Sequence, residues 1–489
     1  MPTPRTTRRP LVIAAVMAAM AMVAIEATII STAMPQIVGD LGGLPLYAWV
    51  FSGFLLTQTA ATIVFGKLAD VYGRKPVLLA GIGLFLAASL LCGLAWSMPA
   101  MIAFRLLQGI GAGAIQPVSL TIVGDLYSVQ ERGRIQGFLA SVWAVSAVVG
   151  PMAGGLIIQH ASWSWIFWIN LPVGLVASGL FVAYLHEDVR RERRPIDAPG
   201  AALFTVAVAA LMVALTEAGR AGWTTSLIAA GLGAVAVGLL VVQERRAPEP
   251  LIAFSLWSQR PIAAANGTSL LAGMALIGLT TFLPMFVQGV LRQSPVVAGL
   301  ALTVMVLGWP IGATLAARSV MRFGLRPILV CGSLLLPVGA VAFVVLGPDS
   351  PPALAGAGSL VMGFGMGLLS NAALMLIQEI VPWTQRGSAT ASNVFSRNLG
   401  STLGATLFGA VLNHGLSSAG GGPAITAERL QQVLASGGAP GEVAGVRLVL
   451  QHALHQTFWA VFLISLAAVA VASLVPHVPL GRTREAPAE

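Results

Sequence analysis

The sequence predicts an all-α polytopic membrane protein with fourteen transmembrane helices, and three observations support this fold class. Of its 489 residues, 56% are hydrophobic and only 9% are charged, whereas soluble domains carry about 25% charged residues. Apolar runs long enough to cross a bilayer recur along the chain. Basic residues are distributed unevenly between the connecting segments, which is typical of membrane topology. We therefore expect two six-helix bundles plus two additional transmembrane helices.

The apolar runs each have about 17 to 25 residues, the length needed to span the hydrocarbon core. The first six lie near residues 11–32, 45–65, 77–97, 99–124, 135–160 and 165–185. Two more lie near 199–216 and 225–243, and the last six near 261–288, 296–317, 327–346, 352–377, 388–413 and 456–476. This order predicts three regions. They are an N-terminal six-helix bundle (1–186), a linker with the two extra helices (187–260) and a C-terminal six-helix bundle (261–489) with a periplasmic loop at 414–455.

Basic residues orient this arrangement in the membrane. Most of the 27 lysines and arginines fall in segments on one side, which the positive-inside rule makes cytoplasmic. The exceptions are Arg220, Arg292, Arg429 and Arg447 on the opposite side, and Arg105 and Arg397 inside membrane runs. Both termini are therefore expected in the cytoplasm. The preference for arginine over lysine indicates a GC-rich bacterium, so we expect the bacterial cytoplasmic (inner) membrane.

The segment 66–76, Gly-Lys-Leu-Ala-Asp-Val-Tyr-Gly-Arg-Lys-Pro, lies between the second and third apolar runs. Its charges are too costly to leave in hydrocarbon, so we expect a short cytoplasmic loop. A related stretch, 323–327, follows in the second half, with Met321 in the place of Asp70. This internal repeat indicates two equivalent six-helix halves. A generic basic loop of another membrane protein is the alternative at this point.

One acidic residue, Glu26, lies deep within a predicted membrane helix. Its position places it about 22 Å from the cytoplasmic edge, and Arg105 on the fourth run lies at about 21 Å. We therefore expect Glu26 and Arg105 to face a shared polar cavity and to interact directly or through water. Glu26 would then be the proton-coupling group, tuned by Arg105. A static buried pair that fixes the packing of two helices is the alternative.

Two glycine-rich motifs accompany these charges. Arg105 opens the stretch Arg-Leu-Leu-Gln-Gly-Ile-Gly-Ala-Gly, and the fifth run contains Gly-Pro-Met-Ala-Gly-Gly at 150–155. Together with the segment 66–76, they resemble motifs of the major facilitator superfamily. These are the G-x-L-x-D-x-x-G-R-[RK] loop, the R-x-x-Q-G-x-G-A pattern of proton-coupled members and the G-x-x-x-G-P-x-x-G-G pattern of exporters. Ser146 replaces the first glycine of the last pattern. A plain glycine-rich packing face is the alternative for 150–155.

The resemblance implies two six-helix facilitator bundles and roles for the motif residues. The implied gating residues are Gly66, Asp70, Gly73, Arg74, Gly150, Pro151, Gly154 and Gly155. Asp70 and Arg74 would form a cytoplasmic charge relay that stabilises the outward-facing state. Residues 26–35 and 163–174 further resemble signatures of the fourteen-helix drug:proton antiporters, although that branch often has aspartate at the position of Glu26 and arginine at that of Ser164.

This resemblance implies a proton-coupled secondary transporter that exports lipophilic, cationic drugs or other amphiphiles by alternating access. It would be driven by the proton gradient without a cofactor or metal. Its partners would be small amphiphilic substrates, protons and the lipid bilayer, with no nucleic acid, and we expect a monomer. Candidate substrate-cavity residues are Gln58, Gln108, Gln116, Trp143, Asn371 and Arg397. Buried polar groups demand partners, so a structural network is the alternative for Arg397.

Other function classes lack their signatures in the sequence. No Walker-type glycine-lysine loop is present, which argues against an ATP-driven pump. The histidines lie outside the middle of the helices, and Cys92 and Cys331 lie in apolar runs, so we expect no enzyme. The alternatives within transport are an exporter of a lipid or specific metabolite, or an uptake symporter. A membrane-embedded sensor or enzyme, or a channel, is a rival from another class.

Overall fold

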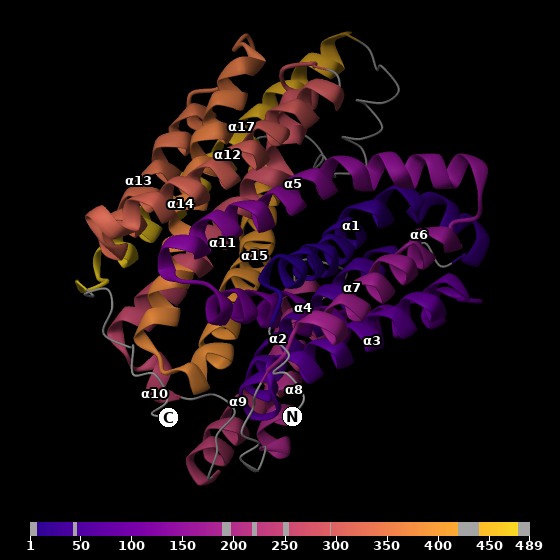
Figure 1. The fold of residues 1–489 in the computed structure, drawn as a ribbon. Helices are drawn as coiled ribbons and strands as arrows, with labels where there is room; N and C mark the ends of the chain where they lie inside the picture. The colour runs from indigo at the N-terminus through magenta and orange to yellow at the C-terminus, as the bar shows by residue number, and fades with distance from the viewer. Residues whose placement is uncertain are drawn as a thin grey trace, which may run out of the picture. The chain divides into compact units, whose positions relative to one another are not determined.

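The computed structural model describes residues 7–42, 46–187, 197–217, 223–247, 254–293, 295–418 and 440–477, and every regular element in these residues is helical (Figure 1). The chain forms two compact units. Unit 1 comprises Met1–Gln259, Leu374–Phe395 and Leu480–Glu489, and unit 2 comprises Arg260–Ala373 and Ser396–Pro479. Unit 1 therefore includes a short piece from the second half of the chain.

Unit 1 contains ten helices in its described N-terminal part. They are α1 (Arg9–Leu41), α2 (Tyr47–Tyr72), α3 (Arg74–Gly93), α4 (Met98–Leu126), α5 (Val129–His160), α6 (Ser164–Trp168), α7 (Asn170–Tyr184), α8 (Ala198–Glu217), α9 (Trp223–Arg246) and α10 (Phe254–Trp257). Helix α4 packs against both α2 and α3, α1 against α5 and α7, and α8 against α9. Buried apolar side chains of α1 to α5 and α7 form the core between them.

Glycines of the fourth-helix motif allow α4 to approach two neighbours closely. A Cβ added at Gly109 would overlap Phe54 and Thr57 of α2, and one added at Gly111 would overlap Phe85 of α3. The motif therefore packs α4 on two sides, which holds Arg105 of the same helix at a defined position.

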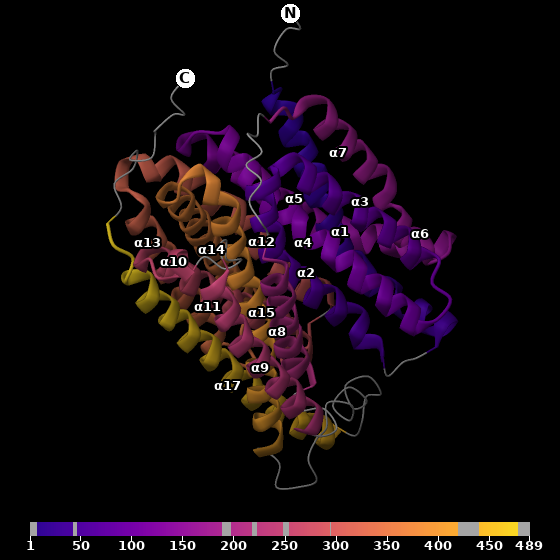
Figure 2. The same cartoon turned by 90° about the horizontal axis from the view of Figure 1, so that it is seen from below.

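Unit 2 holds the second set of long helices. They are α11 (Arg260–Gly289), α12 (Pro295–Phe323), α13 (Leu325–Val344), α14 (Pro352–Ile380), the short 3₁₀ helix η2 (Trp383–Gln385), α15 (Arg386–Ser418) and α17 (Pro440–Ser473). The end of α14, η2 and the start of α15 belong to unit 1. Helix α17 packs against α11 and α13, and Figure 2 shows α11 beside α15. Phenylalanines such as Phe286, Phe343, Phe408 and Phe458 fill the core.

Eleven helices of the described residues are long and apolar enough to span a membrane. Two other expected spans, α5 and α15, have 32 and 33 residues but are not among them. Helix α15 is rich in serine, threonine and asparagine, which lowers its hydropathy. In the seventh expected region, 199–216, Pro199–Leu211 of α8 is apolar but is shorter than the eleven candidate spans. The arrangement of twelve helices plus two stays a prediction.

Two predicted boundaries were wrong. The segment 66–76 is not a loop, because α2 continues to Tyr72 and α3 begins at Arg74, leaving only Gly73 between them. The run 165–185 is confirmed as the candidate span Ser164–Tyr184, although the helix is interrupted at Ile169 between α6 and α7. Helix α15 continues to Ser418 and α17 begins at Pro440, inside the expected loop 414–455, whose residues 419–439 lie outside the described ones. Polar residues can extend a helix beyond the apolar run because backbone hydrogen bonding does not require hydrocarbon.

The repeat in the sequence has a structural counterpart at the two helix junctions. Gly73 between α2 and α3 has φ 93°, and Gly324 between α12 and α13 has φ 84°. An L-residue with a side chain rarely adopts this left-handed conformation. Both halves therefore use glycine to reverse the chain in a single residue.

We expect Gly324→Ala to destabilise the protein by about 1 kcal/mol, the order of cost of a side chain in the left-handed region. A Cβ at Gly324 has no neighbour closer than 4.0 Å, so the effect would come from the backbone alone. The measurement is the apparent melting temperature of the protein in detergent. Gly299→Ala, within α12 and with no neighbour within 4 Å, is the control and should be neutral or stabilising. Equal melting temperatures for Gly324→Ala and the native chain would contradict this account.

Candidate functional site

A fully buried ion pair joins α1 and α4 in the interior of unit 1. Arg105 Nη1 on α4 donates to Glu26 Oε1 on α1 over 2.5 Å, and Asn170 Nδ2 at the start of α7 donates to Glu26 Oε2 over 2.6 Å. Glu26 is 0% exposed, Arg105 1% and Asn170 2%. The pair expected from the matched depths is therefore present as a direct contact. Both carboxylate oxygens of Glu26 are engaged.

Other polar groups extend this pair into a network of five helices. Arg105 Nη1 also donates to Gln108 Oε1 over 2.6 Å, and its Nε donates to the Val50 carbonyl of α2 over 3.1 Å. Gln108 Nε2 in turn donates to Ser89 Oγ of α3 over 2.8 Å. We call Glu26, Ser89, Cys92, Arg105, Gln108 and Asn170 the Glu26 cluster. The arrangement satisfies the charged groups with partners from α1, α2, α3, α4 and α7.

An aromatic ring and a thiol lie against the polar groups of the cluster. The Arg105 guanidinium carbon lies 4.3 Å from the centre of the Phe54 ring, a cation–π contact. Cys92 Sγ lies 3.7 Å from Gln108 Oε1 and is buried. The Glu26 cluster is therefore enclosed by protein in this conformation, so a change of helix packing would be needed to bring water or substrate to the carboxyl.

Sequence reasoning missed two members of this cluster. Asn170 lies in the stretch 163–174 that resembled a family signature, but it was not assigned a role. Ser89 lies in an otherwise apolar run. A polar side chain in a membrane run was the available signal for both, since such groups need internal partners. The spacing along one helix could not show that they meet Glu26.

The predicted substrate-cavity residues are spread over both units. Gln108 belongs to the Glu26 cluster. Gln58 is buried on α2, while Gln116 and Trp143 are partly buried on α4 and α5. In unit 2, Asn371 Nδ2 donates to the Ala313 carbonyl over 2.7 Å, whereas its buried Oδ1 has no partner. Arg397 is partly exposed on α15. Their role as cavity residues stays a prediction.

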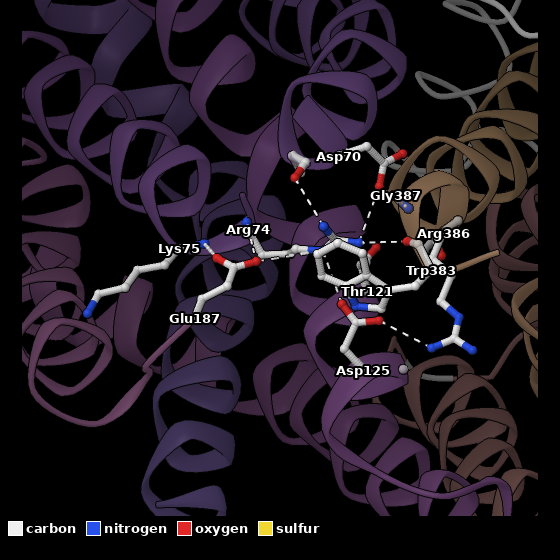
Figure 3. A network of polar contacts seen from close by, with 12 residues as sticks. Asp70, Arg74, Lys75, Thr121, Asp125, Glu187, Trp383, Arg386 and Gly387 are labelled. Carbon is white, nitrogen blue, oxygen red and sulfur yellow. Dashed lines mark hydrogen bonds and ion pairs between the residues drawn. The ribbon is translucent and has the colours of Figure 1, made fainter. Parts of the chain in front are cut away.

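A second charged cluster surrounds Arg74 at the junction of α2 and α3 (Figure 3). Its Nε donates to Asp125 Oδ2 over 3.0 Å, its Nη2 donates to Asp70 Oδ1 over 3.4 Å, and its side chain is only 2% exposed. Glu187 accepts from the backbone N–H groups of Arg74 and Lys75, each over 3.0 Å. One guanidinium thus lies among three carboxylates from α2, α4 and the segment after α7.

The same cluster holds the segment 383–388 from the second half of the chain, which belongs to unit 1. The Arg74 guanidinium stacks on the Trp383 ring at 3.9 Å and donates to the Trp383 carbonyl over 2.9 Å. Asp70 accepts from the backbone N–H groups of Gly387 at 2.8 Å and Ser388 at 2.7 Å. These N–H groups belong to the first turn of α15, so Asp70 caps that helix and its charge meets the positive end of the helix dipole.

Further contacts strengthen this connection. Arg386 Nη1 donates to Asp125 Oδ1 over 3.4 Å, and Arg132 Nη1 of α5 donates to Glu379 Oε1 at the end of α14 over 3.0 Å. A Cβ at Gly66 would overlap the Gly387 carbonyl and Ala391, so glycine is required for this approach. We call Asp70, Arg74, Asp125, Glu187, Trp383, Arg386, Gly387 and Ser388 the Arg74 cluster. It joins residues far apart in the sequence through a largely buried set of charges.

The fifth-helix motif packs close to the Glu26 cluster. A Cβ at Gly150 would overlap Thr28 of α1, whose Oγ1 donates to the Ser146 carbonyl over 3.2 Å. Gly154 is buried, whereas a Cβ at Gly155 would meet nothing within 4 Å. Pro151 is helical, and its side chain lies outside the described ones. Within the described residues, no group of three or more metal-ligating side chains is assembled.

Comparison with known proteins supports transport. A model of the Major Facilitator Superfamily matches residues 16–405. The chain is 34% identical to the multidrug transporter protein MdtP of Bacillus subtilis over 414 residues, covering 84% of this chain and 76% of that protein. It is 33% identical to multidrug resistance protein 3 of the same species over 471 residues, covering 93% and 91%.

Solved structures share the fold at low sequence identity. A human organic anion transporter aligns with TM-score 0.65 and 16% identity, covering 94% of this chain and 99% of that one. A proton:xylose symporter aligns with TM-score 0.58 and 14% identity, covering 96% of each chain. These alignments extend over nearly the whole chain and concern its fold.

We expect Arg105→Met to destabilise the protein by about 3–5 kcal/mol, because it leaves the Glu26 carboxylate buried without its cation. The double variant Glu26→Leu/Arg105→Met should recover most of this loss, since no charge then remains. Apparent melting temperatures in detergent measure both effects. Arg134→Met, an exposed arginine of α5, serves as the control. A loss in the double variant equal to the sum of the losses of Glu26→Leu and Arg105→Met would show that the two side chains are not energetically coupled.

Proposed function

Since the chain belongs to the major facilitator superfamily, we propose that it is a proton-coupled exporter of lipophilic, cationic drugs or related amphiphiles. It would work as a monomer by alternating access in the bacterial cytoplasmic membrane, with both termini in the cytoplasm. The two extra helices would place it in the fourteen-helix drug:proton antiporter branch. Its relatives are transporters rather than enzymes, and two of them are named for multidrug transport or resistance.

The observation that carries this proposal is the complete burial of the Glu26 cluster. Both oxygens of Glu26 are held by donors from other helices, Arg105 on α4 and Asn170 on α7. Movement of α1 relative to α4 and α7 would remove these donors and leave a carboxylate in a water-poor site. A proton taken up at Glu26 would neutralise it, which couples helix movement to proton binding. A cationic substrate could replace Arg105 as the partner of the carboxylate.

The Arg74 cluster supports the other half of the proposed cycle. It ties α2, α3 and α4 to the segment 383–388. By the positive-inside rule we expect it on the cytoplasmic side. Opening toward the cytoplasm would require these contacts to break. The cluster would therefore act as a latch that stabilises the outward-facing state, with Asp70 and Arg74 as its central residues.

The coupling proposal is tested by proton movement in proteoliposomes that contain the purified chain, after addition of a lipophilic cation such as tetraphenylphosphonium. The native chain should move protons in response to the cation, and Glu26→Gln should abolish this response because its amide cannot exchange a proton. Asp40→Asn, at the exposed end of the same helix, is the matched control and should behave as native. Equal proton movement by Glu26→Gln and the native chain would make Glu26 structural.

The latch is tested by the reactivity of a buried thiol. In a chain with Cys92 and Cys331 replaced, Ser392→Cys introduces an isosteric thiol at a buried position of α15, a turn beyond the Asp70 contact. We expect Asp70→Asn to raise its labelling rate about tenfold, as about 1.4 kcal/mol of latch stability is lost.

Glu131→Gln, which alters an exposed carboxyl at the start of α5, is the control for this labelling experiment. It should leave the rate unchanged. If Asp70→Asn leaves the rate unchanged as well, the Arg74 cluster does not limit access to α15, and the latch is refuted.

A further inference from the structure

Helix α15 carries an arginine at the centre of its buried face. Helical spacing puts Arg397 on the same face as Asn393 (i−4), Gly400 (i+3) and Gly404 (i+7), all of which are buried. Helix α11 crosses closely here, because a Cβ at Gly273 would overlap the Arg397 backbone. The backbone of Arg397 thus lies on the buried face of α15, yet the residue as a whole is partly exposed.

Its depth makes this position costly for a cation. Arg397 lies eleven residues after Arg386, which begins α15. At about 1.5 Å per residue this places it about 16 Å along the helix, near the middle of a hydrocarbon core of about 30 Å. A guanidinium at this depth requires an anionic or strongly polar partner.

No such partner exists among the described residues. None of the ion pairs or side-chain hydrogen bonds of the described residues includes the Arg397 guanidinium, and no charged side chain there offsets its burial. Beyond the backbone hydrogen bonds of α15, the Arg397 carbonyl accepts from Ser401 Oγ. In contrast, the buried arginines Arg74, Arg105 and Arg132 each contact a carboxylate. The missing partner of Arg397 would have to come from outside this set of residues.

We propose that Arg397 binds the anionic head group of an amphiphile, which is a carboxylate, sulfonate or phosphate. The apolar tail of this amphiphile would lie among the apolar side chains of unit 2. This rests on the proposed transport function and extends its substrate class from lipophilic cations to amphiphilic anions or zwitterions. The planar guanidinium matches these groups because it can donate two parallel hydrogen bonds. Ser269 and Asn266 lie on the same face of α11 as Gly273, and both are buried. These two polar side chains make the environment of Arg397 less apolar.

The direct test is binding of a fluorescent long-chain carboxylate, dansyl-undecanoate, to the full chain in nanodiscs of phosphatidylcholine. The native chain should bind it, and its uncharged methyl ester should bind at least about tenfold more weakly, corresponding to loss of a charge-assisted contact. Arg397→Gln should weaken carboxylate binding by the same factor, and Arg397→Lys should restore part of it. Arg322→Gln, an exposed arginine of α12, is the matched control and should bind as native.

Several outcomes would overturn the proposal. They are failure of the native chain to bind the carboxylate, equal binding of the ester, and unchanged binding by Arg397→Gln. Nanodiscs that contain phosphatidylglycerol distinguish the source of the anion. Competition by this lipid identifies the occupant as a membrane phospholipid. Uptake of the carboxylate into proteoliposomes identifies the occupant as a transported substrate. Either result supports an anion-binding site at Arg397.

A second measurement separates binding from folding. Removal of an unpaired internal cation should raise the apparent melting temperature of Arg397→Gln in the absence of anion, and the carboxylate should raise that of the native chain alone. A lower melting temperature for Arg397→Gln would reveal an internal partner and refute the site. This assay needs no proton gradient, so failure of proton coupling at Glu26 and failure of anion binding at Arg397 are observed independently.

Discussion

The constraint on which the rest of the structure depends is that a charge inside the bilayer must be surrounded by protein groups, and the Glu26–Arg105 pair shows it most clearly. The pair is fully buried and draws donors and acceptors from α2, α3, α4 and α7. Because helices packed on such a pair cannot separate without exposing a charge, they are restricted to conformations in which the charge is paired, hydrated or neutralised. Glycines of α4 make these close contacts possible. Binding of a proton to the carboxylate is the smallest chemical change that would neutralise such a charge.

The Arg74 cluster obeys the same constraint at the junction of α2 and α3. Three carboxylates, Asp70, Asp125 and Glu187, face two guanidiniums, and the remaining negative charge is directed at the N-terminus of α15. That terminus carries about half a positive charge, so the cluster is close to neutral. The second half lacks the aspartate of this cluster, because Met321 stands where the first half has Asp70. The repeat therefore preserves the helix junction at Gly324 but not the acid on which the proposed latch depends.

The sequence predicted the helical class, the repeat and the Glu26–Arg105 contact, because hydropathy, glycine spacing and membrane depth are local properties. The superfamily is confirmed, while the fourteen-helix branch stays a prediction. The extent of α2 through residues 66–72 was mispredicted, because a helix can leave the membrane without ending. Asn170 and Ser89 escaped notice because their contacts join separate helices. The capping of α15 by Asp70 depends on residues more than 300 positions apart, which no local pattern contains.

Arg105 and Arg397 show why a polar residue in a membrane run cannot be assigned from sequence alone. Both are arginines in expected spans, and both require partners by the same electrostatic argument. The structure gives Arg105 a carboxylate, an amide, a carbonyl and an aromatic face, so any ligand would have to compete with existing contacts. It gives the Arg397 guanidinium no such partner within the described residues. An unpaired cation lowers stability, and departures of this kind from the usual pairing are expected at sites that serve binding. A ligand would therefore gain more from Arg397 than from Arg105, and what it must supply there is negative charge.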